Sequence, residues 1–137
     1  MTKKLHVSPD IEDLIKNISL DYIVESGNNA SGSYLKLKNG IMFCWKKVSG
    51  TTAINQAWGS GYTSGASNNI SLGWWPVSFD STPTVSIMFE RGGLNAWLSS
   101  VSSVSKDYAG EVGLLRFTSQ NSTEYVIHVI AIGRWKQ

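Results

Sequence analysis

The sequence contains few charged residues. Only 16% of its 137 residues are Asp, Glu, Lys or Arg, against about a quarter in an ordinary globular domain. Ser, Thr, Asn and Gly take their place, so we expect a neutral, polar surface that suits sugars better than phosphate backbones. The net charge is +2, and basic residues gather at the ends, as Lys3-Lys4 and Arg134-Trp135-Lys136. The missing basic stripe argues against nucleic-acid binding.

Cysteine is almost absent, because Cys44 is the only one. An intrachain disulfide is therefore excluded. Cys44 lies in the apolar run Ile41–Trp45, which favours a buried and inert thiol. A catalytic thiol would need a neighbouring base, and the sequence offers only His6 and His128.

Long hydrophobic runs are also missing. No stretch of 18 apolar residues occurs, so we expect no membrane insertion. The start of the chain, Met1-Thr2-Lys3-Lys4, is not followed by the apolar core of a signal peptide. We therefore expect synthesis in the cytoplasm, with any exit inside a particle or by cell lysis.

Motifs that carry chemistry are absent as well. There is no phosphate-binding Gly-Lys-Ser/Thr loop, no helical His pair and no Cys/His cluster. A serine triad needs a histidine, and His128 lies inside an apolar strand pattern that predicts a packed, hydrogen-bonded ring. A glycosidase needs two facing carboxylates, and nothing around Glu90 or Glu111 brings them together. The sequence predicts no enzyme, no metal and no cofactor.

The first twenty residues differ from the rest and form a helical or linker segment in our division of the chain. Ser8 to Ile18 reads as a short helix with one apolar stripe, made of Ile11, Leu14, Ile15 and Ile18. Ser8 is a typical N-cap and Pro9 fits the first helical position. A helix of this length is marginal alone, so the stripe would dock either on its own domain or on copies of itself around a symmetry axis.

Residues 21–137 read as a β domain. Ser33–Lys38 alternates in polarity, Ile41–Val48 is the return strand, and Asn39-Gly40 between them predicts a type I′ hairpin turn. Other runs typical of strands are Tyr22–Glu25, Thr84–Arg91, Ala96–Val104, Val112–Thr118 and Tyr125–Ile132. The pattern predicts a small antiparallel β-sandwich of about six to eight strands.

Aromatic residues are the most informative class, with six Trp and five Tyr. We expect most of one set to fill the core, namely Phe43, Trp45, Phe79, Phe89, Trp97, Phe117 and Trp135. Trp58 and Tyr62 are different, because they lie in a Gly/Ser/Asn-rich stretch, residues 55–69, that predicts a long loop. Such rings either anchor the loop or offer a flat surface to a ligand.

Polar side chains beside these rings suggest a sugar-binding site. Sugars present C–H faces to aromatic rings, while amides bind their hydroxyls, and the candidates here are Asn55, Gln56, Asn68 and Asn69. Arg91 and Asn95, across a Gly92-Gly93 turn, form a second candidate set or simply a solvated hairpin tip. The predicted ligand-binding residues are therefore Trp58, Tyr62, Asn55, Gln56, Asn68, Arg91 and Asn95.

Three groups of strings occur in a recognisable order. The first is Tyr22–Gly27, Gly32–Lys36 and Asn39–Trp45; the second is Trp75–Phe79 followed by Thr82–Val85; the third is Ile130–Lys136. Together they resemble the C-terminal domain of tail-fibre and related tail proteins of phages and prophages, over about residues 21 to 137. Trp75 departs from the resemblance, since the family usually has Phe there.

The resemblance implies a sandwich similar to the H-type lectins, assembled as a homotrimer at the tip of a virion's tail fibre beside other phage tail proteins. It also implies contact with a bacterial cell-surface glycan. It supplies no ligand-binding motif by position, so the site residues above rest on the residue pattern alone.

A trimer has independent support in the pattern. Ile41–Val48 and Tyr125–Ile132 are apolar on both faces, and a monomeric sandwich would expose one face of each as a large patch. Packing against symmetry mates would bury it. The leading hypothesis is a tip domain that recognises a glycan without cleaving it. Two alternatives remain: a structural cap that only trimerises the fibre, and a glycan-cleaving tail enzyme.

Overall fold

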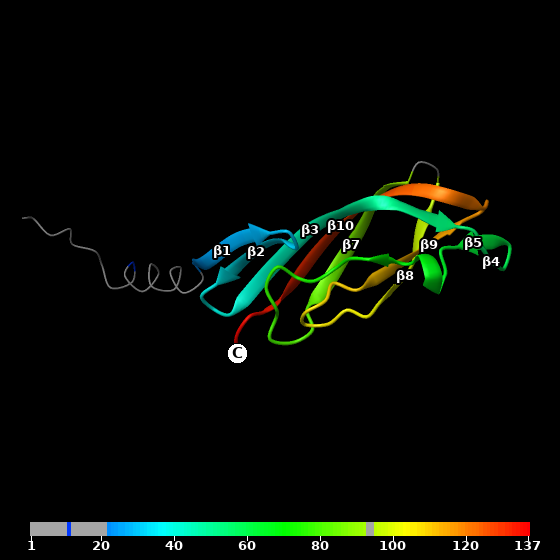
Figure 1. Ribbon diagram of the computed structural model, residues 1–137. Helices are drawn as coiled ribbons and strands as arrows, with labels where there is room; N and C mark the ends of the chain where they lie inside the picture. Colours follow the sequence, from blue (N-terminus) through cyan, green and yellow to red (C-terminus); the bar gives the residue numbers. More distant parts are fainter. Residues whose placement is uncertain (1–10, 12–21, 93–94) are drawn as a thin grey trace, which may run out of the picture.

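The computed structural model describes Ile11, residues 22–92 and residues 95–137, with only the backbone at 91 and 92 (Figure 1). The helix predicted over Ser8 to Ile18 lies, apart from Ile11, outside the described residues.

The described chain forms two antiparallel sheets, which confirms the predicted β-sandwich. Sheet A has the strand order β1 (Ile23–Asn29), β2 (Gly32–Leu37), β3 (Ile41–Ile54), β10 (Gln120–Arg134) and β7 (Thr84–Gly92). Sheet B has the order β4 (Gln56–Trp58), β5 (Gly61–Thr63), β9 (Glu111–Arg116) and β6 (Ile70–Ser71), and β8 (Trp97–Ser102) also pairs with β9. A single 3-10 turn, η1 (Ala66–Asn68), precedes β6.

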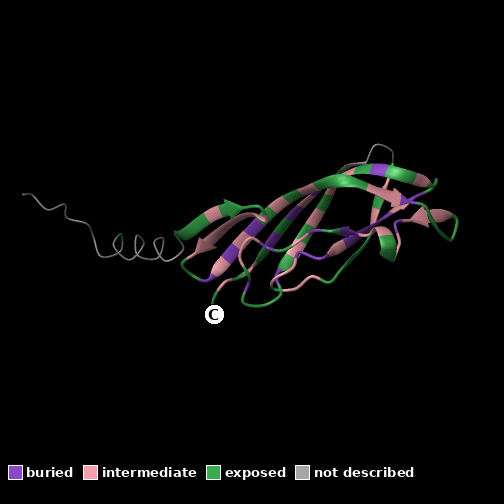
Figure 2. Cartoon of the chain, in the orientation of Figure 1, coloured by how far each residue is buried: buried purple, intermediate pink, exposed green. Residues whose placement is uncertain are grey.

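The two longest strands, β3 and β10, pair along their length, from Ile41 opposite Arg134 to Ile54 opposite Gln120. Their inner and outer faces alternate, as strand geometry requires. Ile127 and Val129 are fully buried, whereas Ile130 and Ile132 are 51% and 47% exposed. Figure 2 shows the same alternation of buried and more exposed residues along both strands.

The core lies between the sheets and draws on both of them. Sheet A contributes buried side chains from β3 and β10, and sheet B contributes Ile70, Val112 and Leu114. Trp75 and Phe79 enter from the segment between β6 and β7, and their rings meet edge to face at 5.7 Å.

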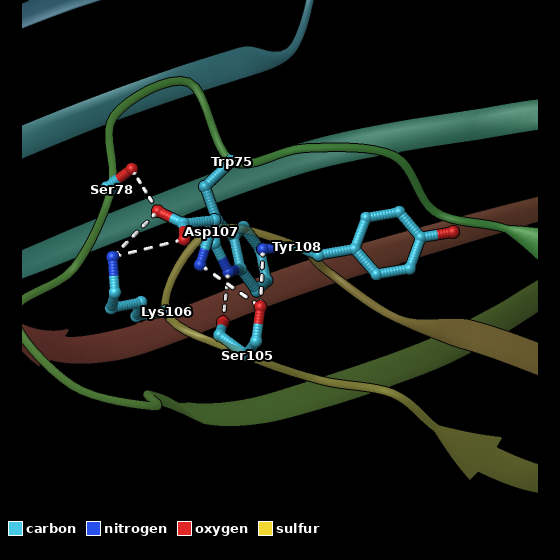
Figure 3. A network of polar contacts seen from close by, with 6 residues as sticks. All are labelled: Trp75, Ser78, Ser105, Lys106, Asp107 and Tyr108. Carbon is cyan, nitrogen blue, oxygen red and sulfur yellow. Dashed lines mark hydrogen bonds and ion pairs between the residues drawn. The ribbon is translucent and has the colours of Figure 1, made fainter.

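A polar network fastens that segment to the loop before β9 (Figure 3). The Ser78 hydroxyl donates to Asp107 Oδ1 at 2.5 Å, and Trp75 Nε1 donates to the Ser105 carbonyl at 3.0 Å. The Ser105 hydroxyl accepts from the backbone N–H groups of Asp107 and Tyr108. The Ser78 bond, helped by Lys106, holds the pKa of Asp107 below its usual value. The segment between β6 and β7 is therefore held against the loop that precedes β9.

The hairpin predicted at Asn39-Gly40 is present, but its turn type was wrong. The Leu37 carbonyl accepts from Gly40 N at 3.1 Å, so Lys38 and Asn39 are the central residues. A type I′ turn needs positive φ at both central residues, and Asn39 is not among the described residues with positive φ, whereas Gly40 has φ of 101°. The Asn39 side chain accepts from Ile41 N at 3.0 Å, which stabilises this turn locally.

The long loop predicted over residues 55–69 is also wrong. β4 and β5 form a small hairpin there, and β5 pairs with β9. Gly, Ser and Asn are poor strand formers, but β9 supplies backbone hydrogen-bond partners to β5, and local propensity takes no account of partners so distant in the sequence.

The predicted aromatic core is right only in part. Phe79, Phe89 and Trp135 pack on the core. Trp45, Trp97 and Phe117 are instead 44%, 47% and 77% exposed, because strand register places them on the outer faces of the sheets.

No helix among the described residues is long and apolar enough to cross a membrane. No group of three or more His, Cys, Asp or Glu side chains gathers in those ranges in a way that could hold a metal ion.

Cys44 is fully buried, as predicted. Burial raises its pKa to about 11, so at pH 8 only about one thiol in a thousand is the reactive thiolate. We expect the folded protein to resist a thiol-specific reagent at pH 8, and the protein unfolded in guanidinium to react fully. Rapid labelling of the folded chain would contradict the burial.

The two phenylalanines with the most different exposure give a matched pair for stability. Phe79 is 2% exposed and Phe117 is 77% exposed. We expect Phe79→Ala to lower the free energy of unfolding by about 3–5 kcal/mol, and Phe117→Ala by about 1 kcal/mol or less. Chemical denaturation of both variants measures this difference. Equal losses would mean that Phe117 is part of the core.

Candidate functional site

Exposed aromatic rings gather at one end of the sandwich, around a cleft of about 380 Å³ that we call the aromatic cleft. It is lined by Trp58, Ser60, Gly61, Trp97, Leu115, Arg116 and Phe117. The labels of β4, β5, β8 and β9 mark this end in Figure 1, away from β1 and β2.

The chain crosses between the sheets twice at this end. It leaves β3 for β4 at Asn55, and it leaves β9 for β10 through residues 117–119. Asn55 Nδ2 donates to Asn121 Oδ1 at 3.0 Å, which joins the start of the first crossover to the end of the second. The strands that carry the aromatic rings are therefore held together where they change sheets.

The β4–β5 hairpin presents Trp58. Trp58 lies directly opposite Gly61, and Gly59 between them has φ of 57°, a conformation that favours glycine. Trp58 is 64% exposed. Since Gly61 has no side chain, the space beside the indole ring stays open. A Cβ at Gly61 would lie only 2.8 Å from the Arg116 carbonyl oxygen, so β5 could not sit this close to β9 with a larger residue there.

Register places the other rings on the same outer face of sheet B. Leu115 lies opposite Thr63 of β5 on one side and opposite Trp97 of β8 on the other. Paired residues share a face and alternate residues return to it, so Phe117 continues the face of Leu115. The rings of Trp97 and Phe117 meet edge to face, with centroids 5.1 Å apart.

Arg116 also lines the cleft, yet it is only 6% exposed. It lies opposite Tyr62, which packs on the core, so its side chain belongs to the inner face of sheet B. Its Nη2 donates to Thr118 Oγ1 at 3.1 Å, while Nε and Nη1 are buried with no partner among the described residues. A buried charge of this kind destabilises the fold, and it places positive potential behind the cleft.

The structure brings only one of the predicted site residues into the cleft, namely Trp58. Tyr62 packs on the core from the inner face, which agrees with the anchoring alternative, and its predicted ligand contact stays a prediction. Asn55 bonds to Asn121, and Gln56 opens β4 opposite Thr63. The Asn68 carbonyl accepts from Thr52 Oγ1 at 2.7 Å in the η1 turn. None of these three residues lines the cleft.

The second predicted set, Arg91 and Asn95, is not part of the cleft. Arg91 pairs through its backbone with Val126 of β10, which places it on β7, the edge strand of sheet A, whereas Asn95 is exposed and follows the end of that strand. The side chain of Arg91 lies outside the description.

Sequence reasoning missed Trp97 and Phe117, which it assigned to the core. One signal was available in the run Val112–Phe117. If Val112 and Leu114 face the core, then Leu115 and Phe117 face outward. Trp97 could not have been found from its own strand, because its place depends on pairing with β9.

The surface of the cleft is mainly aromatic and apolar. None of the described residues that line it is Asp, Glu, His or Cys. The cleft can bind an apolar or C–H-rich surface, because three aromatic rings, Leu115 and the open space at Gly61 line it. The Ser60 hydroxyl can donate or accept a hydrogen bond at the margin of the cleft.

Comparison with known proteins gives similarity of fold. No protein-family model matches the chain, and no curated protein matches its sequence. A solved C-terminal fragment of the P. aeruginosa R1 pyocin fibre matches with a TM-score of 0.50 and 16% identity over 80% of this chain, which spans 28% of that fragment. An N-truncated R1-type pyocin tail fibre matches over 94% of this chain and 98% of its own, with 17% identity and a TM-score of 0.49. At this identity the first match supports the fold alone, and the predicted likeness to H-type lectins stays a prediction.

Proposed function

We propose that this chain is the receptor-binding tip domain of a phage-type tail fibre, and that it recognises a bacterial surface glycan at the aromatic cleft without cleaving it. The observation that carries the proposal is the cleft itself. Trp58, Trp97 and Phe117 are all largely exposed, and clustered exposed apolar surface generally marks a site of interaction. Sugar rings offer C–H faces that pack on such side chains.

The tail-fibre context has two supports. One is the ordered set of strings at the start, middle and end of the β domain, which resembles tail-fibre tips. The other is the fold likeness to a pyocin fibre fragment. In this context we expect the domain on the virion, attached to other tail proteins.

The absence of cleavage is proposed from the cleft's composition. Glycoside hydrolysis needs two carboxyl groups facing each other across the bond, and the described lining holds none. Glu90, one of the carboxylates considered above, is bound to His128 Nε2 at 2.6 Å on sheet A.

The proposed homotrimer would use the outer face of sheet A. Ile130 lies opposite Trp45 and Ser86, and Ile132 lies opposite Phe43 and Thr84, so β3, β10 and β7 share one outer face that is most apolar along β3 and β10. Trp45, Met88, Ile130 and Ile132 are each between 44% and 62% exposed in the single chain. Burial against two copies would remove this surface from water, and three clefts at one tip would bind a repetitive glycan by multivalency.

The binding proposal is tested with a bacterial glycan array and the variants Trp58→Ala and Trp97→Ala. We expect each variant to weaken binding at least tenfold, because each removes a stacking ring. Tyr22→Ala is the control, since Tyr22 is 49% exposed beside β1 and distant from the cleft. Undiminished binding by both cleft variants would refute the site. No binding to any glycan would favour the structural cap, and release of reducing ends would favour the enzyme.

The trimer is tested by light scattering. We expect a mass near three times 15.0 kDa for the wild type, and dissociation in Ile132→Glu, because a charge on the shared face would be buried unpaired. Ser102→Glu, at an exposed position on β8 of sheet B, is the control. A wild-type mass near that of one chain would rule the trimer out.

A further inference from the structure

A second hollow, of about 810 Å³, follows the edge of β3 beyond the end of β2. β2 pairs with β3 only as far as Ser33 opposite Trp45. From Lys46 onward that edge faces the segment Ser71–Trp74 and the tip of the β1–β2 hairpin. Trp45, Met88 and Ile130 of the proposed trimer face line the other side, so a ligand would enter from the side of Ser71–Trp74. We call this hollow the edge groove.

The edge groove contains a cation with an unused hydrogen-bond donor. Lys46 Nζ donates to the carbonyls of Leu72 at 2.5 Å and Trp74 at 2.7 Å. An ammonium group has three N–H donors, and besides these two carbonyls Nζ lies 5.9 Å from the centroid of the Trp75 ring. No third hydrogen-bond acceptor and no carboxylate contacts Nζ among the described residues. Burial lowers the pKa of Lys46, because a desolvated cation without a counter-ion is unfavourable. An anion in the groove would remove that cost.

A second lysine lies nearby. Lys47 lines the groove, as does His128, and none of its described lining residues is Asp or Glu. Glu90 is bound to His128 at 2.6 Å and also interacts electrostatically with Lys47. Lys46 is therefore the lysine of the groove that has no carboxylate partner among the described residues.

The groove also offers an aromatic ring held in place. Trp74 is 63% exposed, and its ring packs edge-on against Tyr108 with centroids 5.1 Å apart. The Tyr108 and Ser71 hydroxyls are hydrogen-bonded at 2.5 Å, so the Tyr108 side chain is also held at its hydroxyl end. Figure 3 shows the Tyr108 ring extending from the polar network at Ser105 and Asp107. The Trp74 ring and the Leu72 and Trp74 carbonyls that bind Lys46 therefore belong to one segment, which these contacts hold in place.

Hydroxyl and amide groups complete the lining. Asn28, Ser31 and Ser33 come from the β1–β2 hairpin and Ser71 from β6. A charged group, an exposed indole ring and several neutral polar groups are the recognition chemistry that an acidic sugar requires.

We propose that the edge groove is a second binding site, for a saccharide with a negatively charged group, placing the anion at the Lys46 ammonium and the sugar ring against Trp74. The charged group is a phosphate ester or a carboxylate. The site extends the proposed glycan recognition, and it can be tested apart from the aromatic cleft because the two share no residue.

The six indole N–H signals of the ¹⁵N-labelled protein separate the two sites in one NMR titration. The probes are glucose, glucose 6-phosphate and glucuronic acid, which share one sugar ring. We expect a charged probe to shift the Trp74 signal with at least fivefold higher affinity than glucose, and the affinity to fall as salt is added. The signals of Trp58 and Trp97 should not follow this order. The charged probe that binds more tightly identifies the anion as phosphate or carboxylate.

Variants assign the effect to the groove. Lys47→Gln, at an exposed position, and Trp74→Ala should each weaken binding of the charged probe at least threefold, and Lys46→Gln should abolish its preference over glucose. Lys106→Gln is the matched control, since Lys106 is paired with Asp107 outside the groove. Lys46 also binds two backbone carbonyls, which Lys46→Gln would release. The Lys46→Gln result is used only if this variant keeps the wild-type spectrum. Otherwise Lys47→Gln and Trp74→Ala decide.

Three outcomes would overturn the proposal. Equal affinity for glucose and both charged probes would show that no anion site exists. An unmoved Trp74 signal with all three probes would show that the groove binds no sugar. A Trp74 signal that shifts with protein concentration alone would show that a second copy of the chain covers the groove. None of these would affect a glycan bound at Trp58 and Trp97.

Discussion

The rest of the structure depends on the antiparallel ladder between β3 and β10. It runs from Ile41 to Ile54 on one strand and fixes which residues face inward, because a slip of one position would turn every side chain to the other face. The ladder buries Cys44 and Ile127 and exposes Trp45 and Ile130. Both strands continue toward sheet B at the same end, so the ladder also determines where the aromatic cleft forms.

The sequence predicted whatever depends on local pattern. The alternation of polar and apolar residues predicted the main strands, and Asn39-Gly40 predicted the hairpin between β2 and β3. The apolar run around Cys44 predicted that its side chain is buried. The predicted turn type failed because the Asn39 side chain stabilises a different turn. The β4–β5 hairpin was missed because its partner, β9, lies some fifty residues further along the chain.

The candidate site was predictable only in part for the same reason. Trp58 stands out because turn-forming residues surround it. Trp97 and Phe117 look like core residues until the register with Leu115 is known. Arg116 and Lys46 are both partly or wholly buried cations without a carboxylate partner among the described residues. The sequence alone could not identify either cation, because the lack of a carboxylate partner is known only once the residues around it have been located in the fold.

The outward position of the cleft has an evolutionary consequence. Trp58, Trp97 and Phe117 lie on a sheet face that adds little to the core, so their replacement leaves the ladder intact. Stability and the proposed ligand preference are therefore carried by different residues, and substitutions at the cleft need not unfold the chain. If the cleft binds as proposed, one or two substitutions would change the surface that it recognises, which is the property expected of a protein whose target itself varies.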